Sequence, residues 1–203
     1  MKTDERQLTK LMKEVDNGAA QLPDFQRGWV WDDGRICALI LSVIHNFPVG
    51  AAMFLEYGNE SIHFKHKPIE GSPSSPDTQP DELILDGQQR LTSLYNALYS
   101  KNPVHTKTEK GKAIDRYYYL NIEKALDPGA DDEEIVISVS TSKQITSDFG
   151  RKVDVDLSNR DQEYKLKMFP LNIILDTSEE QRLGSVAETG RIATSLIITI
   201  NQK

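Results

Sequence analysis

The stretch "ILDGQQRLTSLYNALY", Ile84–Tyr99, contains the change from a β-strand to an α-helix on which the fold depends. Its first residues continue the apolar run "LIL", whereas its later leucines, Leu91, Leu94 and Leu98, recur at intervals of three and four. Such spacing is typical of a helix that buries one face, and a short apolar run is typical of a buried strand. The sequence therefore predicts a strand that leads directly into a helix, with "DGQQR" at the junction.

The start of this helix has two interpretations. Asp86 is a favoured N-cap residue, and Gln89 three positions later would complete a capping box, with Gly87 easing the turn. This explanation does not account for Arg90, because a cation in the first turn opposes the helix dipole at a cost of ~0.3–1 kcal/mol. An anion bound at the helix N-terminus would use that charge, and arginine binds phosphate through two parallel hydrogen bonds. Pairing of Arg90 with a nearby carboxylate is the alternative, and the sequence leaves both open.

A second Gln-Arg pair, Gln26 and Arg27, lies in the segment "QLPDFQRGWVW", which Pro23 and the aromatic residues favour as extended chain. Neighbouring side chains of an extended segment face opposite sides, so one of the two can point at a ligand while the other packs. Trp29 and Trp31 could stack on a base, but aromatic residues at this spacing are more often part of a core. We therefore assign both tryptophans to the core.

The rest of the chain alternates between helical and strand patterns. Apolar spacing predicts helices over residues 3–17, ended by Gly18, and over residues 32–47. We expect strands 49–57 and 61–67 to form a hairpin around Gly58, residues 68–81 to be a flexible loop, and residues 100–115 to be a lysine-bearing loop. Further strands are expected at residues 82–86, 116–122, 133–139, 170–175 and 194–200, and a helix at 159–169. We predict an α+β fold, a single domain over residues 1–203 with a small mixed sheet flanked by helices.

Composition limits the possible functions. The chain has 203 residues, with 24 Lys and Arg against 31 Asp and Glu, and a formal charge of −7. An acidic chain does not present a broad surface that coats nucleic acid, because that affinity comes from neutralising phosphates. The single cysteine, Cys37, excludes an intramolecular disulfide. No apolar run approaches the ~20 residues needed to cross a bilayer, and the charged N-terminus is unlike a secretory signal. We expect a soluble, cytoplasmic protein with no membrane partner.

Two segments together resemble a known family. They are "LPDFQRGWVWDDGRICALILSVIHNFPVGAAMF" and "LILDGQQRLTSLYNALY", in this order and with the Pro-Val-Gly turn between them. The pair resembles the N-terminal domain of the GmrSD family of modification-dependent restriction endonucleases, which act in phage defence. That domain is itself similar to the ParB and sulfiredoxin fold, so the resemblance implies a ParB-like single domain.

The resemblance implies a nucleotide-handling role. In the family, the Asp-Gly-Gln-Gln-Arg signature is held to bind and hydrolyse NTP, and hydrolysis gates DNA cleavage by a separate nuclease. Carried onto this chain, the catalytic residues would be Asp86, which would coordinate Mg²⁺ or orient the attacking water, Gln89, which would place water or metal, and Arg90, which would neutralise charge on the phosphoryl oxygens. The nucleotide and phosphate contacts would come from Gln26, Arg27, Gly87, Gln88 and Arg90.

The chain also departs from the family. The family carries a His-Asn-His nuclease domain on the same chain or on a partner, and the four histidines His45, His63, His66 and His105 do not form one. The sequence ends at "TSLIITINQK", so we expect it to lack the C-terminal helical and nuclease parts. The implied partners are a nucleoside triphosphate with Mg²⁺, a His-Asn-His nuclease domain or subunit, and DNA, modified or plain, bound through the full system.

Two other functions remain open. The first is a non-catalytic, ParB-like module that recognises DNA or binds a partner; its backbone contacts would come from the lysines of the 100–115 loop, although such a run is usually a solvated surface. The second is an autonomous nuclease in which Asp86 joins Asp24, Asp32 or Glu56 at a metal. No carboxylate spacing in the sequence favours this last function.

Overall fold

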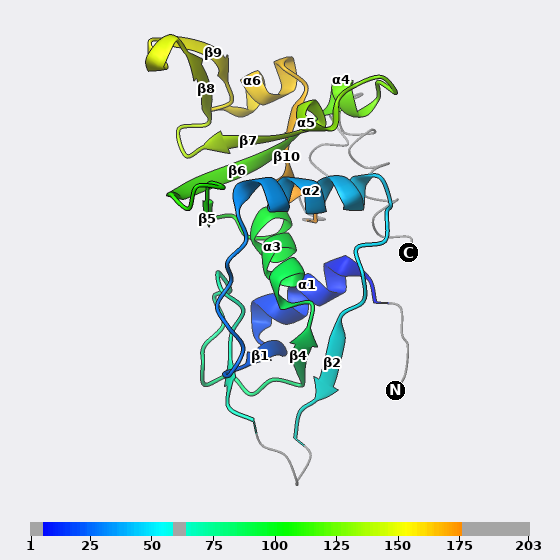
Figure 1. The fold of residues 1–203 in the computed structure, drawn as a ribbon. Helices are drawn as coiled ribbons and strands as arrows, with labels where there is room; N and C mark the ends of the chain where they lie inside the picture. Colours follow the sequence, from blue (N-terminus) through cyan, green and yellow to red (C-terminus); the bar gives the residue numbers. More distant parts are fainter. Residues whose placement is uncertain (1–5, 59–63, 176–203) are drawn as a thin grey trace.

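The computed structural model describes residues 6–58 and 64–175, and it has the predicted α+β architecture (Figure 1). The first sheet is mixed and has the strand order β2-β4-β1-β3. Its central strands β1 and β4 run parallel, and the outer strands pair with them in antiparallel fashion. The bounds of these strands are β1 Ala20–Pro23, β2 Met53–Glu56, β3 His66–Lys67 and β4 Glu82–Asp86.

A second, antiparallel sheet is built around the long strand β6, which pairs with each of the other three strands. Its strands are β5 Val104–Lys107, β6 Ala113–Asn121, β7 Val136–Ser140 and β10 Met168–Pro170. A separate two-stranded hairpin, β8 Gln144–Ser147 with β9 Lys152–Asp156, extends beyond β7 (Figure 1).

Three long helices connect the two sheets. Figure 1 shows α3 running from the end of β4 toward the second sheet, with α2 lying across α3 and α1 beside it. Their bounds are α1 Leu8–Asn17, α2 Asp33–Ile44 and α3 Gln88–Leu98. The short helices are α4 Ile122–Ala125, α5 Asp132–Ile135, α6 Arg160–Lys165, η1 Asp148–Gly150 and η2 Leu171–Ile173.

One apolar core joins these elements. It takes residues from all three long helices and from both sheets, including Tyr118 and Leu120 of β6. Because successive side chains of a strand face opposite sides, Tyr119 of the same strand belongs instead to a smaller cluster on the far face of the second sheet. Asp33, at the start of α2, accepts hydrogen bonds from Tyr118 Oη and Ser138 Oγ, both at 2.8 Å, which fastens α2 to the second sheet.

Several elements were predicted correctly. The strand 82–86 leads into α3, Gly18 ends α1 in a left-handed conformation, and a strand includes "RYYYLN". Residues 68–81 contain no regular element, as expected of a loop. Whether this loop is flexible stays a prediction, and so does the likeness to the ParB fold.

Other predictions were wrong. The hairpin between residues 49–57 and 61–67 does not form, because β2 pairs with β4 and β3 pairs with β1, on opposite edges of the first sheet. The segment 100–115 contains β5, and the strand expected at 170–175 is absent, because β10 ends at Pro170 and a 3₁₀ turn follows at Leu171–Ile173. Helix α1 begins at Leu8 after Gln7, later than residue 3. The β8–β9 hairpin was not predicted, and the strand expected at 194–200 lies outside the described residues.

Candidate functional site

The two Gln-Arg clusters meet at one edge of the first sheet. Because β1 and β4 are adjacent and parallel, the loops that follow them leave at the same edge, where open α/β sheets commonly bind ligands. A pocket of about 280 Å³ lies there. All seven residues to which the sequence assigned a site role line it, together with Trp31 and Leu85. The full lining is Gln26, Arg27, Trp31, Leu85, Asp86, Gly87, Gln88, Gln89 and Arg90.

The junction between β4 and α3 differs from the expected capping box. Gly87, not Asp86, is the N-cap residue, and its φ of +91° places it in the left-handed region that favours glycine. A Cβ atom there would lie 3.1 Å from the Cβ of Ala52. Asp86 is the last residue of β4, and its side chain is 73% exposed. The capping-box interpretation is therefore wrong, and the Asp86 carboxylate remains accessible to a ligand.

Arg90 is held mainly by the main chain of the loop before β2. Its Nη1 donates to the carbonyl oxygen of Val49, and its Nη2 donates to that of Ala51 at 2.7 Å. The Asp86 carboxylate is also near, with 3.7 Å between Nη2 and Oδ2. The loop can approach the guanidinium because Gly50, with φ +86°, has no side chain; a Cβ atom there would lie 3.2 Å from Arg90 Cζ. The ion pair left open by the sequence is present, but the carbonyl contacts are closer.

The three glutamines fasten the loop after β1 to the strand and helix. Gln26 Nε2 donates to the carbonyls of Ile84 and Leu85, at 2.7 and 3.0 Å. Gln88 Nε2 donates to Arg27 O at 2.6 Å. Gln89 makes two contacts, since its Oε1 accepts from Val30 N at 2.9 Å and its Nε2 donates to Gly28 O at 3.1 Å.

Two further residues support the same loop, and the sequence analysis missed both. Lys67 of β3 donates to the carbonyls of Asp24 and Gln26, at 3.1 and 2.5 Å. Ser93 Oγ accepts from Trp29 Nε1 at 3.0 Å. Ser93 lies four residues after Gln89, on the same side of α3, so helical spacing could have indicated it. No sequence signal points to Lys67, because its position depends on how β3 pairs.

The aromatic and histidine predictions have mixed outcomes. Trp29 and Trp31 both pack against the core as expected, but Trp31 also lines the pocket. His66 Nδ1 lies 2.9 Å from Gln21 Oε1, whereas His45 and His105 lie near Asp132 and Asp115. His63 lies outside the described residues.

The family described as "GmrSD restriction endonuclease, N-terminal domain" matches residues 8–196. The chain belongs to this family. It is also 34% identical, over 139 residues, to the uncharacterised protein MJ0686 of Methanocaldococcus jannaschii. That match covers 66% of this chain and 23% of the relative, so the chain spans about a quarter of the length of the curated relative it matches.

The match shows that the chain is a domain of the GmrSD N-terminal type. The charges of this GmrSD-family pocket are unequal, since Arg27 and Arg90 face one carboxylate, Asp86. Arg27 is exposed, and it forms no ion pair with the residues that the structure describes. A pocket with two cations and a helix N-terminus suits an anion.

A metal ion in this pocket would need ligand atoms from a bound nucleotide in addition to those of the protein. Within residues 6–58 and 64–175, no group of three or more His, Cys, Asp or Glu side chains is placed to hold a metal. Mg²⁺ is commonly held by one or two carboxylates together with the phosphates of a nucleotide, and it keeps several waters. The exposed carboxylate of Asp86 beside the α3 N-terminus fits that arrangement.

No helix among the described residues is long and apolar enough to cross a membrane.

Proposed function

We propose that this domain binds a nucleoside triphosphate with Mg²⁺ in the pocket at the N-terminus of α3 and hydrolyses it. The state of the nucleotide would gate DNA cleavage by a separate His-Asn-His nuclease domain or subunit in a modification-dependent restriction system. One observation carries the proposal: Gln26, Arg27 and the whole "DGQQR" segment, about 60 residues apart in sequence, line one pocket whose lining is net cationic.

Binding would use groups that are accessible in this conformation. The first N–H groups of a helix have no partner within the helix, so those of Gln88 and Gln89 can donate to phosphate oxygens together with the dipole of α3. Arg27 would supply a charge-assisted contact from the opposite wall. Asp86 would hold Mg²⁺, which when bound supplies charge neutralisation at the phosphates.

Turnover would require a rearrangement of the same residues. Gln89 uses its amide oxygen and its amide nitrogen on the main chain of residues 28–30, and Arg90 donates to two carbonyls. For Gln89 to position water, or for Arg90 to contact a phosphoryl oxygen directly, these bonds must break. In the conformation described, Arg90 would act on the phosphates through its charge and through the loop that it holds.

Gln89 and Arg90 are already hydrogen-bonded to main-chain groups, and this supports a second candidate function. A pocket whose amides serve mainly to hold its own walls suits binding without hydrolysis, as in a non-catalytic module that recognises DNA or a partner. Such a module would bind DNA with a steep dependence on salt concentration and would release no phosphate from nucleotides.

Calorimetric titration of the chain with GTP, ATP, CTP and UTP in Mg²⁺ tests the proposal. We expect saturable binding of at least one nucleotide. The loss of one charge-assisted hydrogen bond, ~1.5–3 kcal/mol, would weaken that binding by about 10- to 150-fold in Arg27→Ala. Arg151→Ala, which removes an exposed arginine after the remote β8 strand, is the matched control and should bind like the parent chain.

The possible results separate the two functions. Binding with phosphate release that Gln89→Ala abolishes supports the NTPase. Binding without release, at any temperature where the chain is folded, supports the recognition module. If a folded chain gives no heat with any of the four nucleotides, nucleotide binding at this pocket is excluded.

A further inference from the structure

The two tryptophans that follow Arg27 have different surroundings. Trp29 donates its indole N–H to Ser93 Oγ at 3.0 Å, and it does not line the pocket at the N-terminus of α3 (the first pocket). Trp31 lines the first pocket, and it is the aromatic residue of the lining that the structure describes. The sequence placed both rings in the core, whereas the structure separates a tryptophan that only packs from one that also borders a cavity.

The side chain of Trp31 has unused binding capacity. It is half-buried and packs against the core, yet within residues 6–58 and 64–175 it makes no ring contact and its indole N–H has no hydrogen-bond acceptor. Its Nε1 atom is not one of the buried polar atoms that lack a partner, so solvent reaches it. A ring with an apolar body and an accessible donor at a pocket wall suits a ligand that has both flat and polar parts.

The main chain around Trp31 is held on both sides. Val30 N donates to Gln89 Oε1 in the first turn of α3 at 2.9 Å, and the carbonyl oxygen of Trp31 accepts from Thr106 Oγ1 of β5 at 2.9 Å. The next residue, Asp32, is the N-cap of α2 and accepts from a main-chain N–H of that helix. The indole therefore projects from a backbone that is fixed before a ligand arrives, which lowers the entropic cost of binding.

The lining of the first pocket divides into two kinds of surface. Two arginines and the free N–H groups of the first turn of α3 suit phosphate. Trp31 and Leu85, the two apolar side chains of the described lining, supply surface for an uncharged part of a ligand. The hydrogen bond between Val30 and Gln89 places Trp31 beside that first turn, next to the phosphate end of the pocket. Stacking on an aromatic side chain is a common way for proteins to hold a nucleobase.

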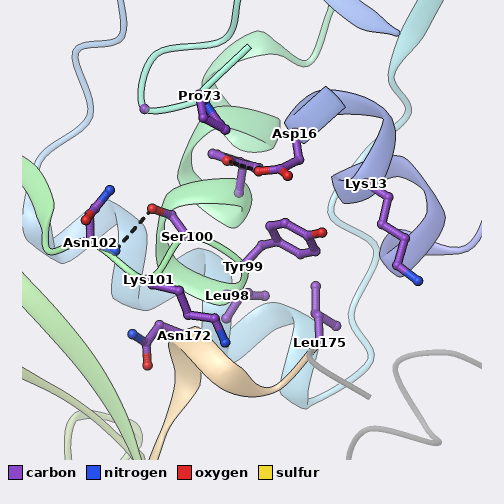
Figure 2. A pocket seen from close by; sticks show the side chains of 12 residues that line it. Lys13, Asp16, Pro73, Leu98, Tyr99, Ser100, Lys101, Asn102, Asn172 and Leu175 are labelled. Carbon is purple, nitrogen blue, oxygen red and sulfur yellow. Dashed lines mark hydrogen bonds between the residues drawn. The ribbon is translucent and has the colours of Figure 1, made fainter. Parts of the chain in front are cut away.

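A second pocket, at the C-terminal end of α3, offers no comparable ring. Figure 2 shows this larger cavity, of about 420 Å³, with the Tyr99 ring near its centre. Tyr99 is already in a tilted contact with Tyr95, with 5.7 Å between the ring centroids, and the neighbouring Leu98 is only 2% exposed. The larger volume is therefore not accompanied by an available stacking surface, and the first pocket is the better site for a base.

We propose that Trp31 is the base-binding residue of the first pocket. The base of the nucleoside triphosphate stacks on the indole face, and the indole N–H, which lies in the plane of the ring and so points past a stacked base, donates to the ribose. This inference rests on the proposed function, because it takes the phosphates to be bound at the N-terminus of α3. Purines cover more of an indole than pyrimidines do, so ATP and GTP should bind more tightly than CTP and UTP.

Inorganic tripolyphosphate separates the base from the phosphates, because it carries the charge of a triphosphate without a base. The test is calorimetric titration with the four nucleotides and with tripolyphosphate, each in Mg²⁺. Trp31→Leu, which keeps an apolar side chain but removes the ring, should weaken purine nucleotide binding by about 5- to 150-fold and leave tripolyphosphate binding unchanged. Trp31→Phe, which keeps an aromatic face, should retain most of the nucleotide affinity.

Three further variants identify the site, and a thermal melt verifies that each is folded. Phe25→Leu removes an exposed ring of the same loop that does not line the first pocket, so nucleotide binding should not change. Lys13→Ala removes an exposed lysine of the second pocket and should also have no effect. Arg27→Ala should weaken the binding of nucleotides and of tripolyphosphate alike.

The outcomes distinguish failure of this inference from failure of the proposed function. If the parent chain binds purine nucleotides and Trp31→Leu binds them equally well, the base does not stack on Trp31, and the inference is overturned while the proposed function stands. An equal loss of nucleotide and tripolyphosphate binding in Trp31→Leu would assign the ring a purely structural role and would also overturn it. If the folded parent chain binds none of the five ligands, both proposals are overturned.

Discussion

The contact between Gly50 and Arg90 provides a quantitative test of how the first pocket is held. Replacing Gly50 by alanine forces a left-handed residue to carry a side chain, which costs ~1–2 kcal/mol. The new Cβ also displaces the guanidinium of Arg90 from Val49, and a hydrogen bond to a charged group contributes ~1.5–3 kcal/mol. We expect Gly50→Ala to lower the free energy of unfolding by ~2.5–5 kcal/mol, or the melting temperature by ~5–20 °C for a chain of this size.

The strain and the lost contact can be separated with two comparisons. Gly111 has a similar φ of +82°, and a Cβ atom there meets nothing within 4 Å, so Gly111→Ala reports the strain alone. In an Arg90→Ala background, Gly50→Ala should likewise cost only the strain, ~1–2 kcal/mol. Urea unfolding of the four variants of this double-mutant cycle measures the coupling. An equal cost of Gly50→Ala with and without the arginine would refute the assignment of Arg90 as the residue that holds this loop.

Four further results are expected. Gln89→Ala removes both hydrogen bonds to residues 28–30, so trypsin should cut after Arg27 faster than in the parent chain. An unchanged cleavage rate would contradict the view that Gln89 holds this loop in place. Burial, aided by the nearby Asp33 carboxylate, raises the pKa of Cys37 to about 12, so iodoacetamide at pH 8.5 should label it slowly when folded and rapidly in urea. Because only the unfolded thiol ionises between its ordinary pKa near 9 and about 12, stability should fall as pH rises through that interval. Glu163→Ala leaves the Tyr119 hydroxyl buried without its 2.7 Å acceptor, and should cost ~1–3 kcal/mol in urea unfolding.

The sequence predicted local structure where its signal was periodic. The leucines of α3 are buried as their spacing indicated, and Gly87 takes the left-handed turn between strand and helix. The apolar run "LNIIL" was assigned to a strand, but it is too short for its period to be measured. Its first three residues, Leu171–Ile173, form a 3₁₀ turn, and Leu171, Ile174 and Leu175 are buried.

Strand partners and the roles of the site residues were harder to predict. Alternation of apolar residues indicates that a segment is a strand, but not which strand it pairs with, so β2 was assigned to β3 instead of β4. In the same way, the sequence identified Arg90 as an unusual cation in a first turn. The carbonyls that satisfy it lie about 40 residues earlier in the chain, at Val49 and Ala51, and only the fold brings them together.

The parallel pairing of β1 with β4 has a consequence for synthesis of the protein. Strand β1 emerges early, yet its parallel partner follows about 60 residues later, and its other neighbour β3 about 45 residues later. At a synthesis rate of ~5–20 residues per second, the central strand waits ~3–12 s before β4 exists. During that time α1 and α2 can form as local structure, but the sheet cannot close. The first pocket, which needs the end of β4 and the first turn of α3, is therefore assembled only after Arg90 has been made.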